Sequence, residues 1–66
     1  MSKVILRLNA TLAKTGLSRS VLYSKISKGE FPKQINLSER SIGFLEEEVN
    51  GWIDERIKAS RPSEVQ

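Results

Sequence analysis

The chain has 66 residues, no cysteine, no histidine and a net charge of +3, with a sequence pI of about 9.6. A chain of this length forms one small domain, which buries only about 60% of its unfolded surface. The missing residue types exclude disulfide bonds, zinc sites built on cysteine or histidine, and a serine–histidine–aspartate triad. We therefore expect no cofactor, no metal, no small-molecule substrate and no enzyme activity.

The basic residues gather in the first two thirds of the chain. Residues 1–45 carry eight basic and two acidic side chains, whereas residues 46–66 carry three basic and six acidic ones. This division is typical of small nucleic-acid-binding proteins, but lysines that only solvate a surface give similar totals. Residues 4–8 are too few, and interrupted by Arg7, to form a signal peptide or a membrane span. We expect a cytoplasmic protein that does not bind membranes.

The N-terminal residues predict an extended segment followed by a short helix. Residues 3–8 are mostly β-branched or aliphatic, which favours a short strand. Asn9 is a good helix N-cap residue and Gly16 is a good C-terminal stop. We therefore expect a first helix over about residues 10–15, with Leu12 and Ala13 facing the core.

A second helix is predicted between two glycines, Gly16 and Gly29. Ser18 can cap it by accepting a hydrogen bond from a backbone N–H in the first turn, so we expect a helix over about residues 19–28. Helix, glycine turn and helix form the helix-turn-helix pattern of DNA-binding proteins. Two helices packed only for stability would give the same signals, so both interpretations stay open at this point.

The second helix has distinct faces. Leu22 and Ile26 are four residues apart and share the face expected to point inward. The opposite face carries only small hydroxyl side chains: Ser20, Ser24 and Ser27. Such a surface can approach another molecule closely.

A β-hairpin is predicted after the second helix. Residues 34–37 and 40–44 alternate polar and apolar side chains on either side of a turn-like Ser-Glu-Arg sequence. The side chains expected to point inward are Ile35, Leu37, Ile42 and Phe44. A hairpin in this place is the wing of a winged helix. Its tip residue Arg40 would reach phosphates or the minor groove, or would only keep the hairpin soluble.

The period becomes helical from residue 45, and a third helix is expected to run to about residue 59. Val49, Trp52 and Ile53 begin its buried stripe, and Trp52 is expected to anchor the core. Three consecutive glutamates, at 46–48, suit the positive end of the helix dipole and do not converge on a metal. The prediction is an α+β winged helix-turn-helix over residues 1–59, with three helices, the hairpin between the second and third, a short N-terminal strand, and a flexible tail over 60–66.

Several blocks of this sequence, in this order, resemble the AlpA family of prophage regulators. They are Arg7-Leu8, Thr15 to Tyr23, Ile26 with Gly29 to Pro32, Leu37 with Arg40 to Phe44, and Glu48-Val49 with Trp52-Ile53. The resemblance spans about residues 6–58. The departures from the family's usual residues are Ala10, Thr11, Gln34 and Phe44.

The resemblance implies a DNA-binding domain related in fold to excisionases and to the heads of MerR-type regulators. Family members regulate transcription of prophage or mobile-element genes, often those for integrase or excision. Some act directly at attachment sites as recombination directionality factors. It also implies a nucleoid-associated bacterial protein whose partner is double-stranded DNA and which can self-associate on DNA.

The residues expected to contact DNA come from the second helix and the hairpin. They are Ser18, Arg19, Ser20, Tyr23, Ser24, Lys25, Ser27, Lys28, Lys33 and Arg40. Arg19 and Ser20 are best placed to approach base edges, and the lysines and Arg40 to hold the backbone. Tyr23 either contacts DNA or lies half in the core. A second hypothesis is a protein-interaction module, such as an antitoxin, whose acidic third helix docks a partner.

Overall fold

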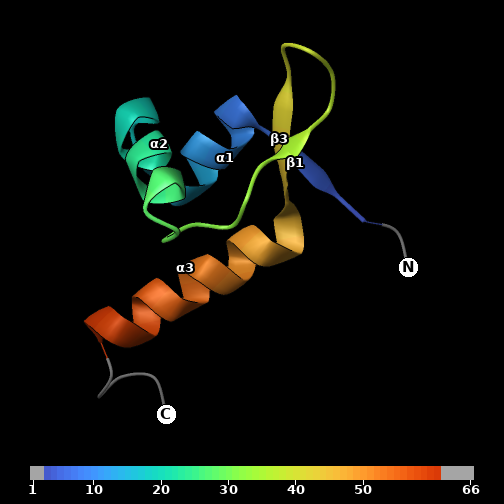
Figure 1. The fold of residues 1–66 in the computed structure, drawn as a ribbon. Helices are drawn as coiled ribbons and strands as arrows, with labels where there is room; N and C mark the ends of the chain where they lie inside the picture. The colour runs from blue at the N-terminus through green and yellow to red at the C-terminus, as the bar shows by residue number, and fades with distance from the viewer. Residues whose placement is uncertain (1–2, 62–66) are drawn as a thin grey trace.

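The computed structural model describes residues 3–61, which form three helices and a three-stranded antiparallel sheet (Figure 1). In chain order the elements are β1 (Ile5–Arg7), α1 (Leu8–Thr15), α2 (Arg19–Ser27), β2 (Ile35–Asn36), β3 (Ile42–Leu45) and α3 (Glu46–Ser60). The expected α+β winged helix-turn-helix is confirmed. Of the expected tail at 60–66, Ser60 belongs to α3 and residues 62–66 lie outside the described residues.

Figure 1 shows how the elements are arranged. α3 crosses the bottom of the view, α1 and α2 lie above it, and the loop between β2 and β3 rises beside them. We call β2, β3 and the turn between them the wing. The N-terminal strand β1 pairs with β3, so the wing is continuous with the start of the chain.

Strand β3 is the centre of the sheet, with the order β1-β3-β2. Its pairing with β2 places Ile35 opposite Gly43. Ile35 therefore shares a face with Gly43 and Leu37, because residues two apart on a strand point to the same side. Ile42 and Phe44 lie on the other face, which packs on the core. The expectation that all four apolar residues of the hairpin point inward is wrong, and Leu37 is 39% exposed.

The core is small and partly aromatic. The buried hydrophobic side chains are Leu22, Phe31, Phe44 and Val49. Phe31 meets Phe44 edge-to-face at 5.4 Å between ring centroids, and its ring lies 4.9 Å from that of Trp52. Trp52 is only partly buried, so it packs against the edge of the core, while Phe44 is the largest fully buried side chain.

Helix α1 begins earlier than the sequence predicts. Its first residue is Leu8 and its N-cap is Arg7, which makes no side-chain capping bond. The assignment of Asn9 as N-cap is therefore wrong. Gly16 ends the helix as expected, with φ of 77° and its N–H donating to the Leu12 carbonyl. Glycine adopts this left-handed conformation without steric cost.

The buried face of α1 also differs from the expected one. Thr11 is completely buried and Ala13 is exposed. Leu8, the first residue of the helix, packs against the core. The positions that share its face, three, four and seven residues on, are Thr11, Leu12 and Thr15. The Thr11 hydroxyl donates to the Arg7 carbonyl at 3.0 Å, so this buried polar group is satisfied.

Candidate nucleic-acid interface

Helix α2 is fixed at its N-terminus by the residue that the sequence indicates. The Ser18 hydroxyl accepts a hydrogen bond from the Val21 backbone N–H at 3.3 Å. This bond satisfies one of the backbone N–H groups that have no partner inside the helix. Arg19, the next residue, therefore starts the helix with a defined orientation.

The C-terminus of α2 is closed by a Schellman motif. The Gly29 N–H donates to the Ile26 carbonyl at 3.1 Å, and the Glu30 N–H donates to the Lys25 carbonyl at 2.8 Å. Gly29 has a φ of 73°, which glycine adopts readily. The expected glycine stop is confirmed, with Lys28 as the cap residue rather than the last helical residue.

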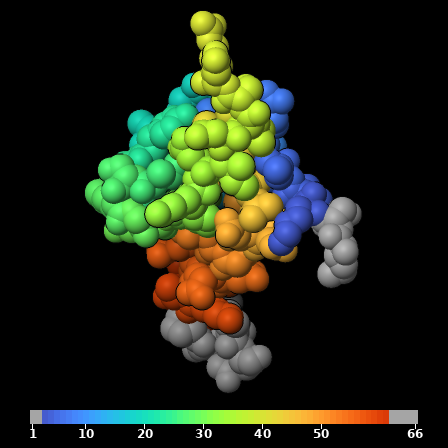
Figure 2. Space-filling view, turned by 45° about the vertical axis from the view of Figure 1, so that its right-hand side comes forward, coloured from blue at the N-terminus to red at the C-terminus, as the bar shows by residue number. Residues whose placement is uncertain are grey.

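The wing is a short, tight hairpin. The Leu37 and Ser38 N–H groups both donate to the Ser41 carbonyl, at 2.8 and 3.2 Å. Figure 2 shows atoms of the wing tip projecting as a narrow column at the top of the view. Arg40 is exposed in this turn, as expected of a tip residue.

A groove of about 370 Å³ lies between α2, the start of α1 and the wing. We call it the wing groove. The residues that line it are Arg7, Leu8, Asn9, Arg19, Tyr23, Arg40, Ser41 and Ile42. Three of them are arginines and none of these described residues is acidic. The groove therefore has a positive field suited to phosphates and to the acceptor atoms of base edges.

Arg7 is the one charged residue among those that line this groove that the sequence-based site prediction missed. Its Nη2 donates to the Ser41 Oγ at 3.4 Å, a long hydrogen bond that reaches from the end of β1 to the wing. The pairing of β1 with β3 brings Arg7 opposite Gly43 and so to the base of the wing. In the sequence, the only local sign of a functional role for Arg7 is that it is a charged residue within the otherwise apolar residues 4–8.

Arg19 and Tyr23 lie on the same side of α2, four residues apart, and both line the wing groove. Tyr23 is 41% exposed, so it belongs to this surface and not to the core. The three serines at 20, 24 and 27 are exposed beside it. The structure thus brings part of the expected site together: Arg19, Tyr23 and Arg40.

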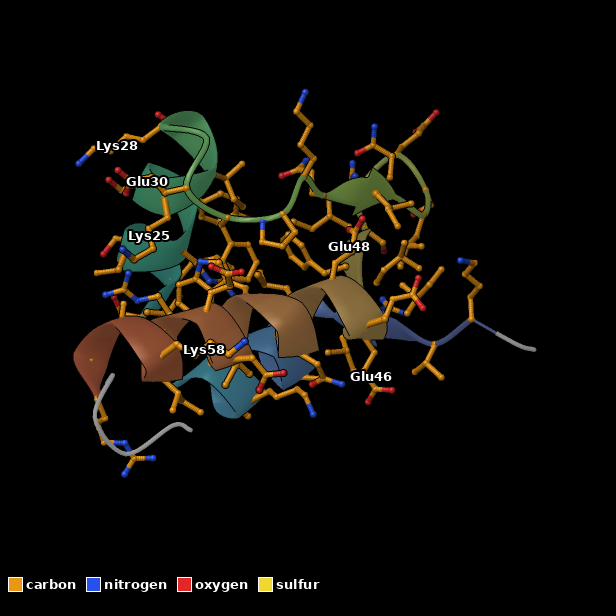
Figure 3. The ribbon with its side chains drawn as sticks, turned by 90° about the horizontal axis from the view of Figure 1, so that it is seen from below. Lys25, Lys28, Glu30, Glu46, Glu48 and Lys58 are labelled. Atoms are coloured by element: carbon orange, nitrogen blue, oxygen red, sulfur yellow. The ribbon has the colours of Figure 1, made fainter. Side chains whose placement is uncertain are left out.

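The three lysines of the expected site do not line the wing groove. Lys25 lies on the other side of α2, with its Nζ 4.0 Å from the Glu30 carboxylate. Figure 3 shows Lys25, Lys28 and Glu30 together at one end of the molecule, away from the wing. Lys33 is exposed in the segment before β2. All three lysines thus lie outside the wing groove.

The acidic turn at the start of α3 pairs with basic residues of this same chain. Glu47 lies 3.2 Å from Lys3, and Glu46 lies 4.0 Å from Lys14. Both pairs are well exposed, so their contribution to stability is small. Within residues 3–61 no group of three or more histidine, cysteine or carboxylate side chains is arranged to hold a metal ion. No helix in the same range is long and apolar enough to cross a membrane.

Comparison with known proteins identifies relatives of bacterial and phage origin. The uncharacterized protein ORF88 of Enterobacteria phage P4 is 42% identical over 52 residues, which are 79% of this chain and 59% of that protein. The DNA-binding transcriptional activator AlpA of Escherichia coli (strain K12) is 35% identical over 60 residues, 82% of this chain and 86% of that protein. The chain therefore spans less than two thirds of the phage P4 protein. No solved structure matches significantly.

The family assignment covers most of the fold. Residues 4–57 match the family described as the prophage CP4-57 regulatory protein (AlpA), which extends from just before β1 to near the end of α3. This range includes every residue of the wing groove. The chain belongs to the AlpA family of prophage regulatory proteins.

Proposed function

We propose that this protein binds duplex DNA in a sequence-specific manner and regulates transcription from a prophage or mobile element. The observation that carries the proposal is the wing groove, which Arg7, Arg19 and Arg40 line together with Tyr23 and which no acidic residue among the described ones lines. The Escherichia coli relative, described as a DNA-binding transcriptional activator, supports it.

Helix α2 is the proposed recognition helix. In helix-turn-helix proteins the N-terminal residues of this helix contact base edges in the major groove. Arg19 and Ser20 occupy that place, and an arginine that pairs with guanine gives about 1–3 kcal/mol of discrimination between bases. The small side chains of Ser24 and Ser27 allow α2 to approach the DNA closely.

The neighbouring residues hold the backbone. Arg7 lies at the base of the wing and Arg40 lies at its tip, and we assign phosphate contacts to both. We assign a further phosphate contact to Ser18, at the N-terminus of α2. Tyr23 contacts a phosphate or a thymine methyl group from the floor of the groove. Lys33 and the α2 lysines Lys25 and Lys28 supply longer-range attraction.

The biological role that we propose is control of integrase expression or of excision of the element. A domain of this size buries roughly 600–1,000 Å² on DNA, which gives modest affinity. We therefore propose that copies bind adjacent sites and assist one another. Direct action at attachment sites, as a recombination directionality factor, is the second candidate. The projecting tip of the wing is suited to contact the backbone of bent DNA.

The alternative of an interaction module with an acidic docking helix receives less support. Its motive was the glutamate triplet, but Glu46 and Glu47 both lie within ion-pair distance of lysines of this chain. The wing groove has no comparable internal neutralisation.

The test is selection of bound duplexes from random oligonucleotides by the purified protein, followed by gel-shift titration at several salt concentrations. We expect one enriched motif, an affinity that falls steeply with salt, and a loss of motif preference in Arg19→Ala. Lys58→Ala, on α3, is the matched control and should keep the preference. Absence of an enriched motif, or binding that does not depend on salt, would exclude the proposed function.

A second experiment separates the two biological roles. Excision of the element is measured with integrase supplied from an unrelated promoter. If the protein acts by transcription alone, it has no further effect in this assay. If it raises excision when integrase is already present, it acts directly at the attachment sites.

A further inference from the structure

A second groove, of about 340 Å³, lies at the other end of α1, between its last turn and the C-terminal half of α3. We call it the α3 groove. Its apolar side chains are Trp52, Ile53 and Ile57, and its basic side chains are Lys14, Arg56 and Arg61. Two hydroxyl side chains complete it, and none of the described residues that line it is acidic.

The α3 groove and the wing groove are well separated. Leu8 and Asn9, at the start of α1, line the wing groove, whereas Lys14 and Thr15, at its end, line the α3 groove. Figure 1 shows α3 at the bottom of the view and the wing at the top. The α3 groove therefore lies away from the surface proposed to face DNA.

Of the apolar side chains of this groove, Trp52 and Ile53 are partly buried and also pack against the core, and Ile57 is exposed. Ile57 is 37% exposed, and Trp52 is held at the groove by its Nε1, which donates to the Glu30 carbonyl at 2.8 Å. The ring packs on Phe31, so the indole is a rigid part of the wall. A rigid aromatic side chain with a polar partner is typical of the anchor points of protein interfaces.

We propose that the α3 groove docks an acidic, amphipathic segment of a partner protein. Carboxylates of such a segment would meet Arg56 and the other basic side chains, while its apolar side chains would cover Ile57 and Trp52. A DNA backbone would neutralise the charges but leave the apolar surface in water. A purely apolar segment would offer Arg56 no carboxylate.

The existing ion pair at the groove does not oppose this assignment. Glu46 lies 4.0 Å from Lys14, and both side chains are more than a third exposed. Exposed pairs of this kind are weak and exchange readily. Arg56 is exposed and lines the groove, and it is the residue on which charge recognition is expected to depend most.

Trp52 makes the proposal directly testable, because it is the only tryptophan of the chain and lines the groove. The probe is a tryptophan-free 14-residue helical peptide with leucines at helical spacing on one face and glutamates at the remaining positions. We expect saturable quenching or a shift of the Trp52 emission on titration. The same peptide with lysines in place of the glutamates should bind at least about tenfold more weakly.

Variants of the protein locate the binding. Arg56→Glu and Ile57→Glu should each weaken binding of the acidic peptide about tenfold or more, with an unchanged circular dichroism spectrum and unchanged affinity for the selected DNA. Lys58→Glu is the matched control, since it makes the same change of charge on α3 at a residue that does not line the groove. It should bind the peptide as the wild type does.

Four outcomes would overturn the proposal. The first is equal binding of the acidic and basic peptides. The second is wild-type affinity in Arg56→Glu and Ile57→Glu. The third is displacement of the peptide by duplex DNA in a variant that lacks Arg19 and Arg40, because the α3 groove would then be a DNA surface. A Trp52 signal that depends on protein concentration alone would assign the groove to a second copy and would equally overturn it.

Discussion

The wing groove and the α3 groove are similar in volume, about 370 and 340 Å³, but are assembled in different ways. Residues from β1, α1, α2 and the wing meet in the wing groove. Most of the α3 groove comes from α3 and its C-cap residue Arg61, with Lys14 and Thr15 added from α1. A groove on one helix follows from the helical period, whereas a groove between four segments exists only after the chain has folded.

The two grooves also differ in chemistry. Arginines and a tyrosine dominate the wing groove, while Trp52, Ile53 and Ile57 give the α3 groove an apolar surface inside a basic rim. The first suits a phosphate-rich polymer, and the second suits a mixed surface such as a protein segment. One small domain thus presents two kinds of surface at opposite ends of its first helix.

The largest expected effect comes from Phe44→Ala, which should disrupt both grooves at once. Phe44 contacts Phe31, and Phe31 contacts Trp52, so this aromatic chain connects the sheet with α3. Removing a fully buried phenylalanine costs about 3–5 kcal/mol. A domain of this length has roughly 3–10 kcal/mol of stability in total. We expect urea denaturation followed by circular dichroism to show little or no cooperative transition at 25 °C.

The control for this variant is Val21→Ala. Val21 is 43% exposed on α2, so its truncation should change the free energy of unfolding by less than about 0.5 kcal/mol. If Phe44→Ala were as stable as this control, the aromatic chain would not connect the two regions.

The second effect should separate the two regions. A Cβ at residue 43 would lie 2.6 Å from Ile5 Cγ2, 3.0 Å from the Leu6 carbonyl oxygen and 3.1 Å from Leu37 Cδ1. Gly43→Ala should therefore force β1 and the wing apart and lower the free energy of unfolding by roughly 1–3 kcal/mol. DNA affinity should fall, whereas the Trp52 emission should stay close to that of the wild type.

Gly51→Ala is the matched change on α3. Nothing lies within 4 Å of a Cβ at this exposed helical position. The substitution should raise the free energy of unfolding by about 0.5–1 kcal/mol, since alanine loses less backbone entropy in a helix than glycine does. Urea denaturation measures the free energy of unfolding of both variants. If Gly43→Ala and Gly51→Ala changed it in the same direction, the difference in space around the two glycines would not determine their effect on stability.

The third effect concerns the start of α2. Ser18→Ala removes the cap that holds the Val21 N–H, so it should lower stability by about 1 kcal/mol. Ser20→Ala, an exposed hydroxyl two residues on, should leave stability nearly unchanged. Thermal denaturation of the two variants measures the difference. If both variants melt with the wild type, the Ser18 bond does not stabilise α2 in solution.

The smallest expected effect tests whether the DNA-binding surface is limited to the wing groove. Arg7→Ala should reduce the slope of log affinity against log salt by about 0.9, the value for one lost phosphate contact. Lys25→Ala, on the side of α2 that faces Glu30, should reduce it by clearly less. Gel-shift titrations over a series of salt concentrations give both slopes. Equal slopes would mean that the groove does not define the DNA-binding surface.

Much of this protein could be predicted because its signals are local. Ser18 and Gly29 mark the ends of α2, since a cap or a left-handed turn depends on residues within one turn of the helix. The helical period from residue 45 predicts α3 to within a residue of its observed end. The sequence also indicates Arg19, Tyr23 and Arg40 as site residues, and these three line the wing groove.

Only the tertiary structure decided the features that depend on distant partners. The inward face of α1 was misplaced because the helix begins at Leu8, where β1 ends after pairing with β3. Ile35 and Leu37 were assigned to the wrong face because a shift of one residue in register reverses every side chain of a strand. Arg7 joins the site through Ser41, 34 residues away, and no local pattern encodes a contact of that separation.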